Sequence, residues 1–314
     1  MIEAKNLHKK FGTTKAVDGV SFEIKTGQVV GFLGPNGAGK TTTMRLLTGY
    51  LSPDDGEATL LGLNLIENSI QVRQRCGYLP ENNPLPEDIE LTDYLHFIGK
   101  LRGLVDLDHR MERVKHVLKV CSLIPMIGKK LGELSKGYRQ RVGLAQSIIH
   151  DPDILILDEP TSGLDPNQVQ EVRSLISNLK KEKTLILSTH ILSEVQHTCD
   201  RVLIINKGKV VADGTPQDLG GSLKDVNRLS VSFDGDKETI RHELENFPKV
   251  TKLIDEPSQE GVGFILESKA EDDLRKDIFR LASSKNWPIL SLQMKKLSLE
   301  EVFRALTQTT QTKP

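Results

Sequence analysis

Residues 34–41 read Gly-Pro-Asn-Gly-Ala-Gly-Lys-Thr and combine three glycines with one lysine and one hydroxyl residue. The stretch matches the spacing G-x-x-x-x-G-K-[ST] in full. Glycines let successive backbone N–H groups turn toward phosphate oxygens, the lysine reaches the β- and γ-phosphates, and the final hydroxyl binds Mg²⁺. The stretch is therefore predicted to bind a nucleoside triphosphate, ATP, together with Mg²⁺. The predicted contacts are Gly34, Pro35, Asn36, Gly37, Ala38, Gly39, Lys40, Thr41 and Thr42, with Thr41 also a metal ligand.

The flanks of this glycine loop predict the elements that must position it. Residues 28–33 form a short apolar run typical of a buried strand, and residues 42–47 begin an amphipathic helix. Such a helix directs its unpaired N–H groups, and about half an elementary charge, toward a bound anion. Strand, glycine loop and helix are the context that phosphate binding requires, which argues against an ordinary glycine-rich turn.

Length and charge limit the classes of protein to which the chain can belong. Its 314 residues predict two domains. Lys and Arg number 42 and Asp and Glu number 43, so the net charge of −1 gives no basic field of the kind that binds nucleic acid. We therefore expect no nucleic-acid partner. An aromatic content of 4% also argues against a surface on which bases stack.

The cysteines and the apolar runs bear on the compartment. Cys76, Cys121 and Cys199 are far apart and odd in number, which suggests neither a disulfide framework nor a metal cluster and favours a reducing compartment. The N-terminus lacks a signal-peptide pattern, and no apolar run approaches the roughly 18 residues that cross a bilayer. We expect a soluble, cytoplasmic chain, so that any transport channel would belong to another polypeptide.

Short strands are predicted on the N-terminal side of the glycine loop, over residues 2–7 and 21–24. Phe11 precedes Gly12 at the tip of the first predicted hairpin, and Val17 follows shortly after. A phenylalanine here is either a core residue or, in front of a phosphate-binding loop, a platform for a nucleobase. We take Phe11 and Val17 as candidate nucleotide contacts.

Two later strands end in residues that can do chemistry. One apolar run ends in Asp158 and Glu159, and the strand predicted over residues 184–189 is followed by His190. Runs that are apolar on both faces are typical of parallel strands covered by helices. A helix predicted over residues 167–181 separates the two strands, which indicates an α/β layered sheet.

Two regions differ from this pattern. Residues 88–150 have apolar side chains at helical spacing and predict a mostly helical subdomain, near the end of which Ser135 is a candidate helix N-cap. Residues 221–314 predict the order β-α-β-β-α-β, which is the ferredoxin-like pattern. A last helix is expected to begin at Ser298, with Glu301 completing a capping box.

With these motifs in this order, residues 1–220 resemble the ATP-binding subunits of ABC transporters. The segment Leu134-Ser135-Lys136-Gly137-Tyr138 looks like the family signature, with Lys136 where the family commonly has glycine and Tyr138 where it commonly has glutamine. The resemblance implies an α/β fold: a phosphate-loop ATPase core with an antiparallel β subdomain and an inserted helical subdomain over about 88–150. A C-terminal α+β (ferredoxin-like) accessory domain over residues 221–314 would follow.

The resemblance also implies a nucleotide site shared between two subunits. In the family, the signature docks on the γ-phosphate of ATP held by the partner subunit, which makes Ser135, Lys136 and Gly137 candidate nucleotide contacts. Asp165 matches the loop that contacts the opposing subunit, and it is a further candidate contact. We therefore expect a homodimer that encloses two ATP molecules.

For hydrolysis, the resemblance assigns roles to several acidic residues and one histidine. Asp158 would hold Mg²⁺, and Glu159 would act as the general base on the attacking water, an effect typically worth about 10²–10⁴-fold. His190 matches the family's switch histidine, which bonds the γ-phosphate and orients Glu159. Glu81 stands where the family usually has glutamine, and it can still ligate Mg²⁺ because hard carboxylate oxygens suit that ion.

Partners and location follow from the same resemblance. It implies integral membrane permease subunits, a coupling helix received near Glu81 and residues 91–94, and a position on the cytoplasmic face of the inner (plasma) membrane. Residues 297–303 look like the tail of the type-2 exporter branch, which includes drug, polysaccharide and gliding-motility ATP-binding subunits. The transported substrate is not encoded in this chain.

Two other classes of function stay open besides transport. A soluble ABC ATPase acting on ribosomes or DNA commonly carries two nucleotide modules or a long coiled-coil insert, and this sequence has neither. A nucleotide sensor without hydrolysis would be expected to lack Glu159 or His190, and both are present. The motifs therefore favour ATP-driven transport.

Overall fold

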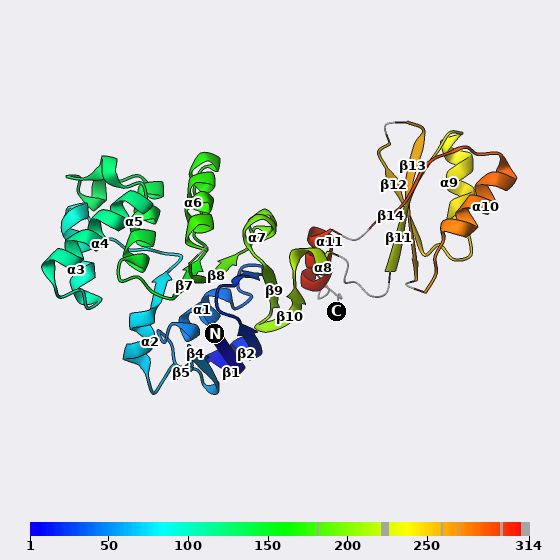
Figure 1. Cartoon of the computed structure of the whole chain (residues 1–314). Helices are drawn as coiled ribbons and strands as arrows, with labels where there is room; N and C mark the ends of the chain where they lie inside the picture. Colours follow the sequence, from blue (N-terminus) through cyan, green and yellow to red (C-terminus); the bar gives the residue numbers. More distant parts are fainter. Residues whose placement is uncertain (181, 221–225, 259, 270, 296–297, 309–314) are drawn as a thin grey trace. The chain divides into compact units, whose positions relative to one another are not determined.

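The computed structural model describes residues 1–180, 182–220, 226–258, 260–269, 271–295 and 298–308. Within these residues the chain forms two compact units, Met1–Pro216 and Gln217–Gln308 (Figure 1). The sequence predicted a boundary after residue 220.

A six-stranded sheet forms the centre of the first unit, in the order β10-β9-β3-β8-β7-β6. Its strands pair in parallel except for β10, which is an antiparallel edge strand. Every residue of β3, β7 and β8 is buried, which explains their apolar side chains on both faces. The bounds are β3 Val29–Leu33, β6 Cys76–Leu79, β7 Ile154–Asp158, β8 Thr184–Thr189, β9 Arg201–Asn206 and β10 Lys209–Gly214.

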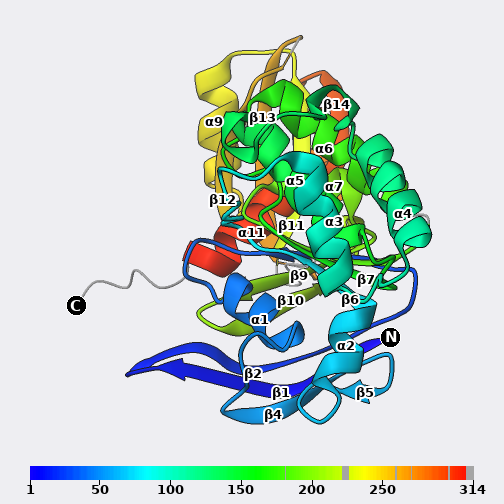
Figure 2. The same cartoon turned by 90° about the vertical axis from the view of Figure 1, so that its left-hand side faces the viewer.

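An antiparallel sheet in the order β2-β1-β4-β5 lies on the other side of helix α1 (Figure 2). The two sheets and α1 share one core, in which Phe22 and Phe32 meet edge to face with ring centroids 5.1 Å apart. The bounds are β1 Ile2–Phe11, β2 Thr14–Ile24, β4 Asp55–Leu60, β5 Leu63–Asn64 and α1 Lys40–Leu47. β1 and β2 exceed the predicted strands because their pairing continues to the partners Phe11 and Thr14.

The region predicted to be helical, residues 88–150, contains α3, α4 and α5. Leu95, Val117 and Leu144 are fully buried, and α5 also packs against β6 of the central sheet. Asp106 caps α4 by accepting a hydrogen bond from His109 N at 2.8 Å. The bounds are α3 Leu91–Leu101, α4 Leu107–Val120 and α5 Lys136–Ile148, with short 3₁₀ turns η1 Ile124–Met126 and η2 Leu131–Glu133.

The other described helices before residue 220 each connect two successive strands of the chain. Their bounds are α2 Ser69–Arg75, α6 Pro166–Leu179, α7 Leu192–Thr198 and α8 Pro216–Leu219, the last of which runs into the second unit. α6 begins one residue before the predicted helix, because Asp165 caps it and Pro166 occupies its first position. A membrane-spanning segment is not found, since none of the described helices combines the necessary length with the necessary apolar character.

The second unit has a four-stranded antiparallel sheet in the order β12-β13-β11-β14. Helices α9 and α10 cover one face of the sheet, over a core that includes Phe233, Ile240, Phe264 and Ile278 (Figure 1). The bounds are β11 Val226–Phe233, α9 Lys237–Glu245, β12 Lys252–Glu256, β13 Val262–Lys269, α10 Arg275–Lys285, β14 Ile289–Lys295 and α11 Leu299–Gln308.

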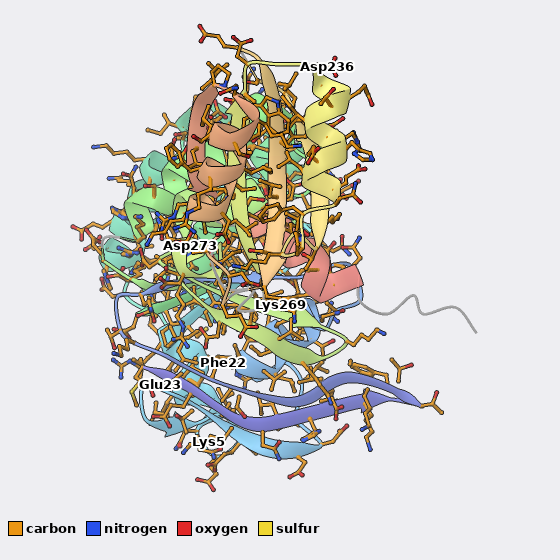
Figure 3. The ribbon with its side chains drawn as sticks, turned by 90° about the vertical axis from the view of Figure 1, so that its right-hand side faces the viewer. Lys5, Phe22, Glu23, Asp236, Lys269 and Asp273 are labelled. Carbon is orange, nitrogen blue, oxygen red and sulfur yellow. The ribbon has the colours of Figure 1, made fainter. Side chains whose placement is uncertain are left out.

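Local caps explain where two of these helices begin. Asp236, labelled in Figure 3, accepts a hydrogen bond from Thr239 N at 2.9 Å and so begins α9. At α11, Ser298 N donates to Glu301 Oε2 at 2.8 Å while Glu301 N donates to Ser298 Oγ at 3.3 Å. The predicted capping box at Ser298 is therefore confirmed.

Candidate functional site

The glycine loop joins the end of β3 to the start of α1, as the motif predicts. Gly39 has φ 106°, and a Cβ there would lie 2.3 Å from the Ala16 carbonyl oxygen. A Cβ at Gly34 would lie 2.5 Å from the Ile205 carbonyl oxygen. Glycine is required at both positions, because the chain passes too close to its neighbours for any side chain. The N–H groups at the start of α1 then remain open to an anion.

Lys40 is buried within this loop, with 6% of its surface exposed. Its Nζ donates to Gly34 O at 2.8 Å and to Pro35 O at 3.3 Å, and it lies 3.2 Å from Glu159 Oε1. The ammonium group thus lies between the phosphate-binding loop and the carboxylate at the end of β7. An ammonium group at this place can hold an anion that binds to the N–H groups of the loop.

Asp158 has the features of a metal ligand. One of its carboxylate oxygens, Oδ1, accepts hydrogen bonds from Thr41 Oγ1 at 3.2 Å and from Ser188 Oγ. The other, Oδ2, is buried and has no hydrogen-bond partner among the described residues. Burial raises the pKa of Asp158. A buried oxygen without a partner beside a threonine hydroxyl is a donor set that fits Mg²⁺.

Glu159 and His190 form a hydrogen-bonded pair at the ends of neighbouring parallel strands. His190 Nδ1 lies 2.8 Å from Glu159 Oε2, and Glu159 is 6% exposed. The Glu159 N–H donates to the carbonyl and to the hydroxyl of Ser188, at 3.1 Å each. The sheet therefore fixes the direction in which the carboxylate points.

A cavity of about 380 Å³ opens beside the glycine loop, and it is lined by Lys40 and Glu159 but not by Asp158 or His190. Its lining residues are Ala16, Asn36, Gly37, Gly39, Lys40, Thr41, Thr42, Glu81 and Glu159. Glu81 thus lies in the same cavity as the glycine loop and Glu159, as the prediction for a metal ligand requires. Gly34, Pro35 and Ala38 belong to the loop but do not line the cavity.

The two candidate contacts in the first hairpin have different surroundings. Val17 is 1% exposed and packs in the core, while its neighbour Ala16 lines the cavity. Successive strand residues face opposite sides, so we replace Val17 with Ala16 in the set of candidate contacts. Phe11 is 50% exposed at the end of β1, which excludes the core alternative, but it does not line the cavity.

The signature segment lies elsewhere in the chain. Ser135 caps α5 by accepting a hydrogen bond from Tyr138 N at 3.4 Å. The exposed Lys136 side chain lies against Gly163, where a Cβ would be 2.0 Å from its Nζ. Asp165 accepts hydrogen bonds from the next two N–H groups of α6, at 3.0 Å each. Ser135, Lys136, Gly137 and Asp165 do not line the glycine-loop cavity, so one chain does not bring all the candidate residues together.

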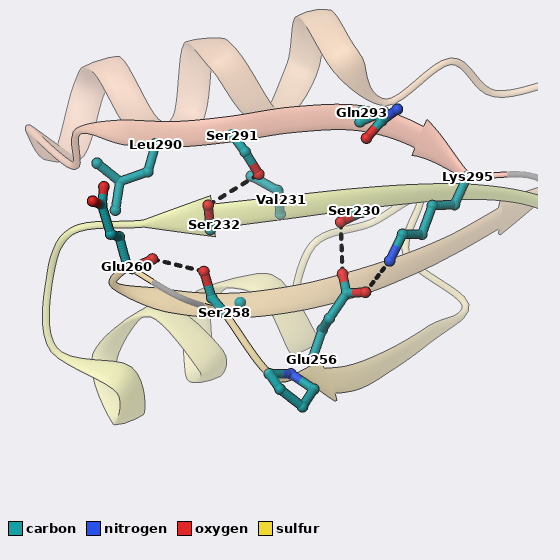
Figure 4. A pocket seen from close by; sticks show the side chains of 12 residues that line it. Ser230, Val231, Ser232, Glu256, Ser258, Glu260, Leu290, Ser291, Gln293 and Lys295 are labelled. Atoms are coloured by element: carbon teal, nitrogen blue, oxygen red, sulfur yellow. Dashed lines mark hydrogen bonds and ion pairs between the residues drawn. The ribbon is translucent and has the colours of Figure 1, made fainter.

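The second unit has a hollow of about 530 Å³ on the face of its sheet that α9 and α10 leave open (Figure 4). Several polar side chains there bond to one another: Ser232 Oγ donates to Ser291 Oγ at 3.0 Å, and Glu256 accepts from Ser230 at 2.6 Å and pairs with Lys295. None of the buried polar atoms that lack a partner, in the described parts of the chain, belongs to this hollow. Among the described residues, an unpartnered buried carboxylate oxygen such as Asp158 Oδ2 is thus found in the first unit and not in this hollow.

The fold and the site define a phosphate-loop ATPase, since the glycine loop, the strand-end carboxylates and the histidine all meet at the carboxyl edge of a parallel sheet. A family model described as "ABC transporter" matches residues 17–162. A second model, "AAA domain, putative AbiEii toxin, Type IV TA system", matches residues 130–195 of the same core.

Curated relatives cover most of the chain. It is 36% identical over 260 residues to Nod factor export ATP-binding protein I of Burkholderia lata, covering 81% of this chain and 84% of the relative. It is 37% identical over 235 residues to bacitracin transport ATP-binding protein BcrA of Bacillus licheniformis, covering 74% of each. The chain belongs to the ABC transporter ATP-binding proteins, and it is an ATPase of that family.

Solved structures agree with this assignment. A dimeric ATP-binding cassette, MJ0796, in a post-hydrolysis state bound to ADP and Pi has a TM-score of 0.62 at 25% identity, covering 68% of this chain and 98% of that one. CbiO1 from Clostridium perfringens, part of the complex cbiONQ, has a TM-score of 0.63 at 27% identity, covering 79% and 95%.

Proposed function

We propose that this chain powers an exporter by hydrolysing ATP between two copies of itself, on the cytoplasmic face of a membrane that holds two permease subunits. The export direction is supported by the relatives named for Nod factor export and bacitracin transport. The dimer is supported by the similarity to a dimeric cassette. A soluble ATPase acting on ribosomes or DNA is not favoured by these relatives.

The observation that carries the proposal is the Glu159–His190 pair beside Lys40, with contacts of 2.8 and 3.2 Å. Glu159 accepts a proton from water as the water oxygen bonds to the γ-phosphorus and the bond to the β–γ bridging oxygen breaks. His190 holds the carboxylate in orientation. Lys40 and the loop N–H groups hold the phosphates. Mg²⁺, held by Thr41, Asp158 and Glu81, would neutralise phosphate charge when bound.

The complete site needs a second copy of the chain. The helix N-terminus at Ser135 is exposed, and it lies outside the glycine-loop cavity of its own chain. A partner's Ser135, Lys136 and Gly137 would therefore close the cavity over the γ-phosphate. Lys136 would add a full positive charge to the anion site, which the glycine common at this position in the family does not.

The permease contact is proposed at a groove of about 430 Å³ beside α2 and the end of α3. Its lining includes the exposed apolar side chains Ile70 and Leu101 together with Arg73 and Arg102. The family resemblance implies instead the cleft near Glu81 and residues 91–94, but Leu91 and Tyr94 there are buried, with exposures of 0% and 6%. An apolar groove with basic neighbours suits a short helix from a membrane subunit that carries apolar and acidic side chains.

The C-terminal unit is proposed to be a ferredoxin-like accessory domain. Its elements follow the order β-α-β-β-α-β, with β11 and β13 in the middle of the sheet and α9 and α10 on one face. The unit does not contain the residues proposed to act on ATP, so an accessory role is the one that its composition supports.

Substitution of the proposed base tests the function. In Glu159→Gln, ATP binding should persist while the hydrolysis rate falls by about 10²-fold or more, because the water loses its proton acceptor. Bound ATP should then hold two copies together. Multi-angle light scattering on the variant, with and without ATP and Mg²⁺, measures the molar mass and so distinguishes monomer from dimer. A variant that binds ATP and stays strictly monomeric would contradict the shared site, and wild-type hydrolysis by it would contradict the base.

A further inference from the structure

A further buried carboxylate accepts hydrogen bonds from both of the chain segments that carry Glu159 and His190. Glu194, in α7, is 2% exposed. Its Oε2 accepts a hydrogen bond from Thr189 Oγ1 at 2.6 Å, and its Oε1 accepts one from Thr161 Oγ1. The sequence gives no sign of this, because a glutamate in the first turn of a short helix is ordinarily exposed to solvent.

The two threonines adjoin the residues proposed to act on ATP. Thr161 lies two residues after Glu159, and Thr189 directly precedes His190. One carboxylate therefore joins the chain beyond β7 to the end of β8, and the contact between Glu159 and His190 spans the same two segments. Thr189 Oγ1 also accepts a hydrogen bond from Ile191 N at 3.0 Å, so the same hydroxyl fixes the backbone on the far side of the histidine.

The third partner of Glu194 is Arg173 from α6. Its Nη2 lies 3.9 Å from Glu194 Oε1 and donates to Ser193 Oγ at 3.2 Å. Two hydroxyl donors and one guanidinium satisfy a carboxylate that would otherwise be costly to bury. Buried ionic groups add little stability compared with well-packed apolar residues, so the geometry that Glu194 imposes explains it better than stability does.

We propose that Glu194 is a positioning residue for ATP hydrolysis, which holds the segments after β7 and β8 at the separation where Glu159 and His190 meet. The inference rests on the roles proposed above for those two residues. Glu194 does not line the glycine-loop cavity. Its loss should therefore lower turnover and leave ATP binding intact, because a misplacement of about 1 Å can cost about 10²-fold in rate.

The test compares Glu194→Ala and Glu194→Gln in the full-length chain, by kcat, KM and the affinity for a fluorescent ATP analogue. The alanine variant should lose about tenfold or more in kcat, while its affinity changes by less than about threefold. The glutamine variant should recover most of the turnover, because its amide can accept from one threonine and donate to the other. Gln196→Ala, at an exposed position of the same helix, is the matched control and should keep wild-type turnover.

The Glu159→Gln background separates positioning from a structural role. If Glu194 acts through Glu159, Glu194→Ala adds no further loss to single-turnover hydrolysis in that background. A further independent loss, an equal loss of ATP affinity, or wild-type turnover in a folded Glu194→Ala would each overturn the proposal. If the alanine variant does not fold, Thr161→Val and Thr189→Val replace it under the same criteria. If Glu159→Gln alone keeps full activity, Glu159 is not the base, and both the proposed function of Glu159 and this inference fail. If Glu159→Gln is inactive while Glu194→Ala is fully active, only the inference about Glu194 fails.

Discussion

Glu159 has a backbone conformation that ordinary loop residues avoid. Its φ of 48° lies in the left-handed region, where a residue other than glycine typically costs about 1–3 kcal/mol. Both hydrogen bonds of its N–H go to Ser188, and these stabilise the turn. The strain directs the carboxylate between Lys40 and His190, which supports a role for Glu159 in hydrolysis.

Glu81 adds a second carboxylate to the glycine-loop cavity, at the position where the family resemblance leads us to expect glutamine. Its carboxylate faces Asp158 closely enough to contribute to the raised pKa of Asp158, after the larger effect of burial. In Glu81→Gln, kcat at saturating Mg²⁺ should stay within about twofold. The Mg²⁺ concentration for half-maximal hydrolysis should rise about fivefold, which corresponds to about 1 kcal/mol for a partly solvated charge. A Mg²⁺ titration of the hydrolysis rate measures both.

The control is Asp88→Asn, an exposed acid beyond the cavity that should leave the titration unchanged. Equal Mg²⁺ dependence in Glu81→Gln and wild type would show that Glu81 is not a ligand.

The sequence predicts which segments of the chain form the site, but it does not predict every residue of those segments that takes part. Lys40, Asp158, Glu159 and His190 could be placed together because parallel strands end at the same edge of a sheet. The sequence does not show that Ala16 lines the cavity while Val17 packs in the core, since which side of a strand faces the cavity depends on the register of β2 with β1. Glu194 was missed because burial of a charged side chain depends on partners that are distant in the sequence.

At the scale of elements, His150 links the end of α5 to β6. Its Nε2 lies 3.3 Å from the Cys76 carbonyl oxygen, and its Nδ1 is buried without a partner among the described residues. Burial, with Arg102 and other nearby positive charges, lowers the pKa of His150 to about 4 from an ordinary value of 6.5. Below pH 6.5 the unfolded chain binds a proton that the folded chain does not, so stability falls as the pH falls.

The prediction concerns unfolding in urea at pH 7 and at pH 5. From pH 7 to pH 5, the free energy of unfolding of the wild type should fall by about 1–2 kcal/mol more than that of His150→Gln, because the variant has no imidazole to protonate. Circular dichroism follows the whole chain, and fluorescence of the single tryptophan, Trp287, reports on the C-terminal unit alone. His116→Gln, which removes an exposed histidine of α4, should behave as the wild type does. If His150→Gln and wild type lose equal stability, the histidine is not neutral in the fold.

Elements were predicted most accurately where pattern alone decides them. β7 and β8 coincide with continuous apolar runs, and the helices of residues 88–150 have apolar residues at helical spacing, and the structure has all of them where expected. β1 and β2 were predicted too short, because polar edge residues continue to pair with their neighbours when the apolar pattern has ended. Strand length there is set by the pairing, which a single sequence does not show.

At the scale of the whole molecule, the separation of the signature from the glycine-loop cavity has a consequence that a mixing experiment can measure. Lys40→Ala removes the phosphate lysine but keeps Ser135, whereas Ser135→Arg blocks the signature but keeps Lys40. Each variant alone should be inactive, since both of its shared sites contain one damaged half. In a mixed dimer one site combines the intact loop of one chain with the intact signature of the other, and the second site carries both defects.

Mixing equal amounts of the two inactive variants should therefore restore hydrolysis. If subunits exchange freely and the sites act independently, half of the dimers are mixed and one of their two sites works, which gives about a quarter of the wild-type rate. The phosphate release rate should rise with total protein concentration, because the active species is a dimer. If each site lay within one chain, hydrolysis would not recover at any mixing ratio, because neither variant would have a complete site. That result would exclude a site shared between two chains and would leave the ATPase assignment intact.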